Sequence, residues 1–223
     1  MIGGGAGRAE KKFKSLTKAL TEKLRESIVS GKFAPGDKLS EETLSASLHA
    51  GRVAVREALR LLETEGYVSF LANNEVVVSK PTGEEIKDYY TIASVLEGLA
   101  ARLAVENAQA EEIAHLRELH QLLKEACQKR DLTRYFDANS TFHRFIAEVA
   151  RNERLYRLID QLRQEIQKTR ILLLHVPQRL DYSMREHDQI MDAFLKKNPQ
   201  LAETTMVRHL SNQMDILRKA LDQ

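Results

Sequence analysis

Several kinds of residue are scarce in this chain, and their scarcity limits what the protein can be. Cys127 is the only cysteine among 223 residues, so an intrachain disulfide is excluded and a reducing compartment is favoured. No apolar run approaches the roughly 20 residues needed to cross a bilayer. The first residues also lack the apolar stretch of a secretory signal. We therefore expect a cytoplasmic protein with no membrane partner.

Proline and glycine are also few, and their positions divide the chain. The four prolines and ten glycines cluster at a few breaks, one of which lies at residues 79–84. This break predicts two folded domains, over residues 15–80 and 81–223, after a flexible glycine-rich tail at residues 1–14. The composition, with 43% hydrophobic and 30% charged residues, is that of a globular protein.

Positive and negative charges are nearly balanced, so charge alone neither requires nor excludes a nucleic-acid partner. Residues 1–80 hold 13 basic and 10 acidic side chains, whereas residues 81–223 hold 21 and 22. The first domain is therefore only slightly more basic than the second. Any nucleic-acid function has to be argued from the pattern of residues.

The hydrophobic pattern of the first domain predicts three helices followed by a β-hairpin. Apolar residues recur every three or four positions in three segments, and two further segments flank an Asn-Asn pair that suits a tight turn. The predicted helices cover residues 16–30, 41–48 and 52–65, and the predicted strands cover residues 67–70 and 75–79. This order is that of a winged helix-turn-helix, whose third helix enters the major groove of DNA.

Two arginines lie on the exposed side of the third predicted helix. Arg52 and Arg56 are spaced i, i+4, away from the apolar side that carries Val55 and Leu59. A guanidinium group offers a two-pronged contact to guanine or to phosphate. Two arginines on one helix face are also common as solvated surface residues, so the spacing alone leaves both interpretations open.

The amino-acid sequence of this domain is more specific than the spacing of its arginines. The stretches LRESIVSGKFAPGDKLSEETLSASL and GRVAVREALRLLETEGYV, within residues 16–80, resemble the GntR family of bacterial transcription regulators. The resemblance implies a winged helix-turn-helix in which Arg52 and Arg56 contact DNA. It implies that Val53 on the same helix, and Asn73 with Asn74 in the wing, also face the DNA.

The chain departs from this family at the surface that would read DNA. Gly51 and Val53 stand where the family usually has serine and threonine, and Ala54 stands where it has proline. Glu42 occupies a position on the second helix where some members have arginine. These changes bear on which DNA sequence the protein prefers.

The second domain is almost unbroken helical pattern, which predicts an all-α bundle. The predicted helices cover residues 84–107, 110–130, 132–150, 153–175, 182–197 and 200–221. Such amphipathic helices bury their apolar stripes by packing against one another. The fold class predicted for the whole chain is therefore mainly α, with a small hairpin wing in the first domain.

Four polar residues in the last third of the chain are spaced like the ligands of one metal ion. Asn139 and His143 are four residues apart, so on a helix their side chains share a face. His187 and His209 fall in two further predicted helices, so three helices can direct imidazoles at one point. Imidazole is a common ligand of zinc and also suits nickel and iron. A single histidine is more often a packed core residue, so the interpretation rests on the set.

The sequence around these residues resembles the FCD domain of FadR-type GntR regulators. The segments that carry the likeness are LEGLAARLAVENA, NSTFHRFIAEVARNERL and EHDQIMDAFLKKNPQLAETTMVRHL. The resemblance implies that Asn139, His143, His187 and His209 bind a divalent metal. Zinc and nickel are the favoured metals, and iron and manganese are the alternatives.

The same resemblance implies a small-molecule effector. Relatives with this domain sense small organic acids, whose carboxylate can occupy open positions on the metal. Ala93 stands where the family often has an arginine, four residues before Glu97. Arg102 and Arg170 are the candidates to replace that arginine and contact the acid.

The combined features predict a ligand-responsive, sequence-specific transcription regulator. We expect a homodimer formed through the second domain, because a dimer reads the two half-sites of a palindromic operator. Two alternatives stay open at this stage. One is a metal-dependent hydrolase, since three histidines and a water are also the ligand set of catalytic zinc sites. A hydrolase would need a general base at the metal, and Glu186 beside His187 is expected to point away from it. The other is a regulator whose metal is purely structural.

Overall fold

The chain folds into two compact units. The structure, a computed structural model, describes residues 5–173, 176 and 179–221. The first unit comprises the chain up to Pro81 together with Gln167–Ile171, and the second comprises Thr82–Ile166 and the chain from Leu172 onward. None of the helices in these described ranges is both long and apolar enough to cross a membrane.

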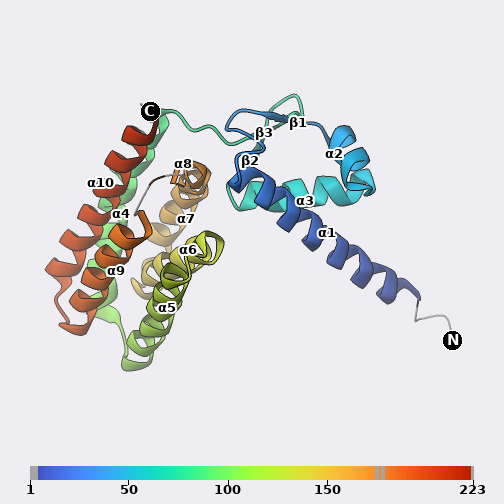
Figure 1. Ribbon diagram of the computed structural model, residues 1–223. Helices are drawn as coiled ribbons and strands as arrows, with labels where there is room; N and C mark the ends of the chain where they lie inside the picture. The colour runs from blue at the N-terminus through green and yellow to red at the C-terminus, as the bar shows by residue number, and fades with distance from the viewer. Residues whose placement is uncertain (1–4, 174–175, 177–178, 222–223) are drawn as a thin grey trace. The chain divides into compact units, whose positions relative to one another are not determined.

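The first unit is a winged helix-turn-helix (Figure 1). It consists of the helices α1 (Gly5–Val29), α2 (Glu41–Leu48) and α3 (Arg52–Thr64) and the strands β1 (Lys38–Leu39), β2 (Val68–Phe70) and β3 (Val76–Val78). β3 lies between β1 and β2, and both pairings are antiparallel. Buried aliphatic side chains, among them Leu24, Val55 and Leu59, hold the helices together. The predicted fold of this unit is confirmed.

Two parts of the first unit differ from the sequence prediction. α1 begins at Gly5, so most of the segment expected to be a flexible tail is helical. Residues 9–14 are mainly alanine, glutamate and lysine, which favour helix and extend the amphipathic stretch that follows. β1 was not predicted, because a strand of two residues is too short to show an alternating pattern.

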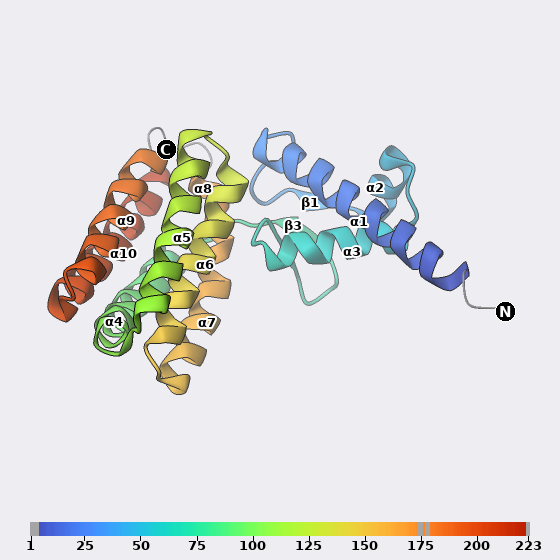
Figure 2. The ribbon, with the colours of Figure 1, turned by 90° about the horizontal axis from the view of Figure 1, so that it is seen from below.

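The second unit is a bundle whose long helices lie side by side (Figures 1 and 2). Its helices are α4 (Gly83–Asn107), α5 (Ala110–Gln128), α6 (Leu132–Val149), α7 (Glu153–Lys168), α9 (Arg179–Leu195) and α10 (Pro199–Leu221). The end of α7, from Gln167, and the start of the short helix α8 (Arg170–Leu173) group with the first unit. α4 packs along α10 and also contacts α6, while α9 contacts both α5 and α10. Large buried side chains such as Tyr90, Phe142 and Phe194 fill the core. The all-α prediction for this unit is confirmed.

The helix predicted over residues 153–175 is interrupted in the structure. α7 ends at Lys168, Thr169 forms a turn, and α8 begins at Arg170. The segment contains neither glycine nor proline at this point, so the apolar repeat runs across the turn and gives no signal of the break. The end expected at His175 lies outside the described residues.

Candidate metal centre and DNA-reading helix

Three histidines from three helices meet in the core of the second unit. His143 lies on α6, His187 on α9 and His209 on α10, and each is at most 1% exposed. The ring centroid of His143 lies 5.3 Å from the centroid of His187 and 5.3 Å from that of His209. The centroids of His187 and His209 are 4.6 Å apart. One ligand atom from each ring lies within 4.8 Å of the other two. The structure thus brings together the histidines that the sequence places on separate helices.

The δ nitrogen of each ring is already engaged by an acceptor. His143 Nδ1 donates to Glu97 Oε2 at 2.8 Å, His187 Nδ1 to the Ser183 carbonyl at 2.7 Å, and His209 Nδ1 to Glu186 Oε2 at 2.7 Å. An acceptor at Nδ1 fixes the neutral tautomer that carries its proton there. The lone pair of each ring is therefore on Nε2.

The three Nε2 atoms converge on the same space. His143 Nε2 and His187 Nε2 are 3.2 Å apart, and two lone pairs at this distance repel each other. His209 Nε2 is buried and has no hydrogen-bond partner among the described residues. Two nitrogens held by one zinc ion, at about 2.0–2.1 Å and in tetrahedral geometry, lie roughly 3.4 Å apart. The spacing and the type of donor therefore fit a divalent cation bound by three neutral imidazoles.

Burial keeps the imidazoles neutral in the folded protein. It lowers the pKa of His143 to about 3, and it also lowers the pKa of His187 and of His209. Neutral imidazole is the form that binds a metal. Burial alone would raise the pKa of Glu97, but Arg163 and His143 hold that pKa at about 2, so the carboxylate stays charged.

Asn139, the fourth predicted ligand, lies one turn before His143 on α6 and is half-buried. A residue four positions earlier on a helix projects from the same side, so Asn139 is on the face that carries His143. The cluster of converging nitrogens is formed by the three histidines. Asn139 therefore stays a predicted ligand beside it.

The two arginines predicted to contact an acid have different surroundings. Arg102 on α4 lies 3.3 Å from Glu203 on α10, and its side chain is 38% exposed. Arg170 begins α8, and its side chain lies outside the part of the chain that the structure describes. Ala93, where the family often has arginine, is buried in the core.

Two buried arginines that the sequence analysis missed lie close to the residues that hold the histidines. Arg163 on α7 donates from Nη2 to the Glu97 oxygen that binds His143, at 2.5 Å. Arg179 at the start of α9 lies 3.8 Å from Glu186 Oε2 and donates to Gln213 Oε1 at 3.1 Å.

A sequence signal existed for Arg163, because it falls in the apolar stripe of α7 between Ile159 and Ile166. Glu186 was expected to point away from the metal, and its carboxylate instead binds the ring of His209 and the side chain of Asn212. This carboxylate therefore fixes the orientation of the His209 ring.

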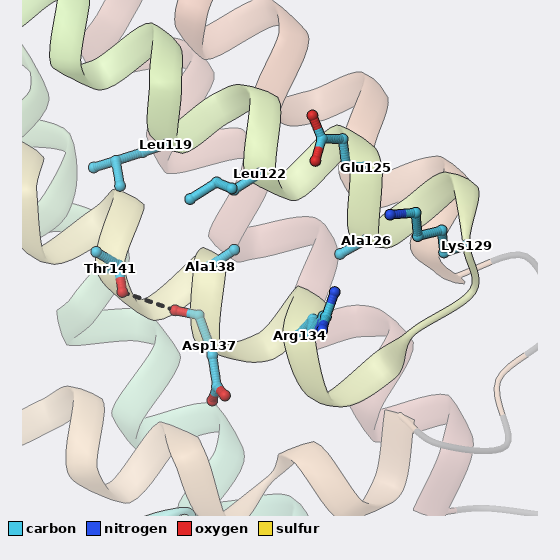
Figure 3. Close-up of a pocket in the computed structure, with 9 residues that line it drawn as sticks. All are labelled: Leu119, Leu122, Glu125, Ala126, Lys129, Arg134, Asp137, Ala138 and Thr141. Atoms are coloured by element: carbon cyan, nitrogen blue, oxygen red, sulfur yellow. Dashed lines mark hydrogen bonds between the residues drawn. The ribbon is translucent and has the colours of Figure 1, made fainter.

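A separate groove of about 380 Å³ lies between α5 and α6 (Figure 3). Aliphatic side chains and charged ones line it together; they are Leu119, Leu122, Glu125, Ala126, Lys129, Arg134, Asp137, Ala138 and Thr141. The α6 residues of the groove recur at a spacing that places them on a different face of the helix from His143. None of the predicted site residues lines this groove.

The predicted DNA-reading residues of α3 are exposed and held in place by α2. Arg52 Nη2 donates to Glu42 Oε1 at 2.7 Å, and Arg56 Nε donates to Glu41 Oε1 at 2.7 Å. Val53 is 68% exposed, and an exposed aliphatic group on this helix suits the methyl group of thymine. The first turn of α2 thus orients both guanidinium groups of α3.

The wing contains the tight turn that the Asn-Asn pair predicts. The Leu71 N–H donates to the Glu75 carbonyl at 2.8 Å, which closes the loop between β2 and β3. Asn74 has a φ of 60°, and Asn73 Oδ1 accepts from the Glu75 N–H at 3.1 Å. Asparagine tolerates this left-handed backbone better than most residues, which explains why the pair forms the turn. Both asparagines are exposed at the tip of the hairpin.

Comparison with known protein families matches both units. Residues 16–78 match the family described as bacterial regulatory proteins, gntR family, and residues 88–212 match the FCD domain. The chain is a GntR-family regulator. Its FCD domain agrees with the FadR-type subfamily that the sequence resembles.

Relatives of this GntR-family regulator are similar to it over most of their length. The HTH-type transcriptional regulator YdhC of Bacillus subtilis is 28% identical over 201 residues, which cover 90% of each chain. The HTH-type transcriptional repressor RspR of Escherichia coli is 24% identical, over 88% of this chain and 86% of RspR. The family is one of transcription regulators, so this protein is not an enzyme and the hydrolase alternative is excluded.

Solved structures share the fold. Escherichia coli McbR/YncC superposes with a TM-score of 0.66 at 23% identity, covering 92% of this chain and 97% of that one. A GntR transcriptional regulator from Rhodococcus sp. RHA1 gives 0.64 at 25% identity, covering 91% and 97%. The combination of winged helix-turn-helix and helical bundle is therefore that of known regulators.

Proposed function

We propose that this GntR-family regulator binds a palindromic operator as a homodimer and responds to a small organic acid at a metal centre in its FCD domain. The observation that carries the proposal is the convergence of three buried, neutral imidazole nitrogens in the core of the second unit. The protein would act in the bacterial cytoplasm, where the operator DNA lies. Arg52, Val53 and Arg56 on α3, with Asn73 and Asn74 in the wing, would contact that DNA.

The metal would be held by His143, His187 and His209, with Asn139 as a fourth ligand. Three imidazoles suit zinc or nickel best, and iron or manganese are the alternatives. A bound divalent cation supplies a positive charge and open positions for a carboxylate. Glu97 and Glu186 orient two of the rings, so their role is to fix the direction of the Nε2 lone pairs.

Arg179 is the residue that we assign to the carboxylate of the acid. It is 6% exposed, and its Nη1 lies 3.8 Å from Glu186 Oε2 but makes no hydrogen bond among the described residues. A guanidinium with an unused N–H group binds a carboxylate strongly, because the hydrogen bond is assisted by both charges. Arg179 would thus take the role that the sequence analysis offered to Arg102 and Arg170.

A thermal-shift screen tests the effector assignment. Malonate, succinate, lactate and citrate would be added to zinc-loaded and to EDTA-treated protein. A ligand at 100 times its dissociation constant stabilises the folded state by about 2.7 kcal/mol, which raises the melting temperature of a chain of this size by roughly 5–10 °C. We expect at least one acid to do so in the loaded protein only.

Two variants connect this shift to Arg179. Arg179→Gln should lose the response to the acid, whereas Arg102→Ala, which removes an arginine of α4, should keep it. If no acid shifts the loaded wild-type protein, the metal is structural and the effector proposal is wrong.

The proposed dimer would form through an apolar stripe on α4. Ile92 and Val95 are 53% and 64% exposed, and Leu96, Leu99 and Leu103 continue the same face and are half-buried. These positions recur at helical spacing, so they form one continuous stripe. A contiguous apolar surface of this kind usually marks a protein interface, and a second copy of α4 offers the same stripe in return.

Val95→Glu is expected to convert the dimer to a monomer and to weaken operator binding, because it buries a charge at the centre of the interface. Sedimentation velocity at micromolar concentration measures the first effect, and a gel shift measures the second. Leu122→Glu is the matched control, since Leu122 is 52% exposed on α5, outside the α4 stripe. A Val95→Glu protein that sediments as a dimer would contradict the proposed interface.

A further inference from the structure

The part of the first unit that would read DNA carries no excess positive charge. Residues 19–80 hold eight basic and nine acidic side chains. The basic groups around the DNA-reading arginines are paired inside the unit, and the pairs are Arg52–Glu42, Arg56–Glu41, Arg60–Glu63 and Lys38–Glu75. Attraction to phosphates supplies a large share of the affinity of most proteins for DNA. This surface alone is therefore poorly matched to a polyanion.

The excess positive charge of the unit lies in the first part of the chain. Residues 1–18 hold five basic side chains and one acidic side chain. Lys11, Lys12 and Lys18 on α1 are exposed, and Lys11 and Lys18 lie seven residues apart on one face. Thr17 and Leu20 are buried against the unit. The exposed lysines therefore lie on a helix whose buried side is anchored to the unit.

α1 carries these lysines past the start of the recognition helix α3. Arg25, near the end of α1, donates through Nε and Nη2 to Glu65, just after α3, at 2.8 and 2.7 Å. From this pair both helices run toward the same end of the unit but at an angle to each other, and α1 continues beyond the first turn of α3 (Figures 1 and 2). Lys12 lies 13 residues before Arg25 in the sequence, and Arg52 lies 13 residues before Glu65. Lys12 and Arg52 are therefore at a similar number of helical turns from the Arg25–Glu65 pair.

We propose that the amino-terminal half of α1 binds the phosphate backbone beside the major groove that α3 enters. α1 packs on the apolar side of α3, away from the exposed Arg52 and Arg56. Its amino-terminal half projects past the first turn of α3, so its lysines lie away from the bases that α3 would read and can face the flanking phosphates (Figure 1). The contact is independent of sequence and rests on the proposed role of α3 as the recognition helix.

The test is the salt dependence of DNA binding by the full-length protein. The affinity of the wild type and of the triple variant Lys11→Ala, Lys12→Ala, Lys18→Ala would be measured by fluorescence anisotropy on two duplexes. One duplex is enriched by in vitro selection with the wild type, and the other has a random sequence. Each phosphate contact contributes about 0.9 to the slope of log affinity against log salt.

The triple variant is expected to lose up to about 2.7 units of this slope. Between about 50 and 200 mM salt the wild type would then lose roughly 40-fold more affinity than the variant. The ratio of affinities for selected and random DNA should stay the same, because α1 reads no bases. Lysine-to-arginine substitution at the same three positions should restore the slope, since it keeps the charge.

A matched control changes the net charge equally, but in the second unit. Lys129→Ala, Lys196→Ala, Lys219→Ala removes three exposed lysines of the second unit and should leave the slope unchanged. An unchanged slope in the α1 variant, or an equal loss in the control, overturns the proposal while leaving the function of α3 intact. If the wild type shows no preference for the selected duplex, the proposed DNA-reading function fails and the α1 contact fails with it.

Discussion

Replacing His187 with alanine is expected to remove the bound metal and to lower the melting temperature. The ring packs against both His143 and His209 and is fully buried, so its loss deletes one of three converging nitrogens. A cation at 100 times its dissociation constant stabilises the folded state by about 2.7 kcal/mol, or roughly 5–10 °C for a chain of this size. Differential scanning fluorimetry should show this shift between zinc-loaded and EDTA-treated wild type, and no shift in His187→Ala.

The control for this substitution is His115→Ala. His115 lies on α5, its side chain is 51% exposed, and its partner is Glu118 rather than the cluster. The control should keep both the metal, measured by plasma mass spectrometry, and the shift on chelation. The histidines hold no ion if His187→Ala still contains one metal per protomer. The same conclusion follows if EDTA leaves the melting temperature of the wild type unchanged.

Arg56→Ala is expected to weaken operator binding by a factor of roughly 5 to 150. The estimate follows from the loss of one two-pronged base contact, which is worth about 1–3 kcal/mol. Glu41 accepts from Nε of Arg56, whose side chain is 55% exposed, so this bond does not use the two terminal nitrogens of the guanidinium. Gel-shift titration at fixed salt on a selected operator measures the effect.

Arg117→Ala is the matched control for Arg56→Ala, because Arg117 is an exposed arginine on α5. It removes the same charge from the second unit and should leave the affinity unchanged. Circular dichroism should show the same helix content for both variants, since both side chains are exposed. Equal affinities of Arg56→Ala and wild type would mean that α3 is not the helix that reads the DNA.

Local chemistry explains why much of the first unit could be predicted from the sequence. α2 begins and ends where predicted, and Ser40 caps it by accepting from the Thr43 N–H at 3.3 Å. The hairpin follows from the asparagine pair, which sets its own turn. The helical start of α1 could not be predicted with the same rules. The glycine-rich first residues indicate a flexible tail, and this signal outweighed the six helix-forming residues that follow them.

The histidines of the candidate site could be found from the sequence, but the residues that hold them could not. Three imidazoles on separate amphipathic helices are an uncommon pattern, and the family resemblance makes it specific. Glu97 and Arg163 depend on how distant helices pack, since Glu97 and His143 are 46 residues apart in the chain. A charged residue in an apolar stripe is the only signal the sequence offers for such partners.

The central claim is that the three histidines hold one divalent metal ion, and anomalous X-ray diffraction tests it most directly. Crystals of the full-length, zinc-loaded protein would be measured on both sides of the zinc absorption edge. The account predicts a single anomalous peak in the FCD domain, at about 2.0–2.1 Å from Nε2 of His143, His187 and His209. An FCD domain without such a peak, in which His143 Nε2 and His187 Nε2 instead share a proton, would contradict it.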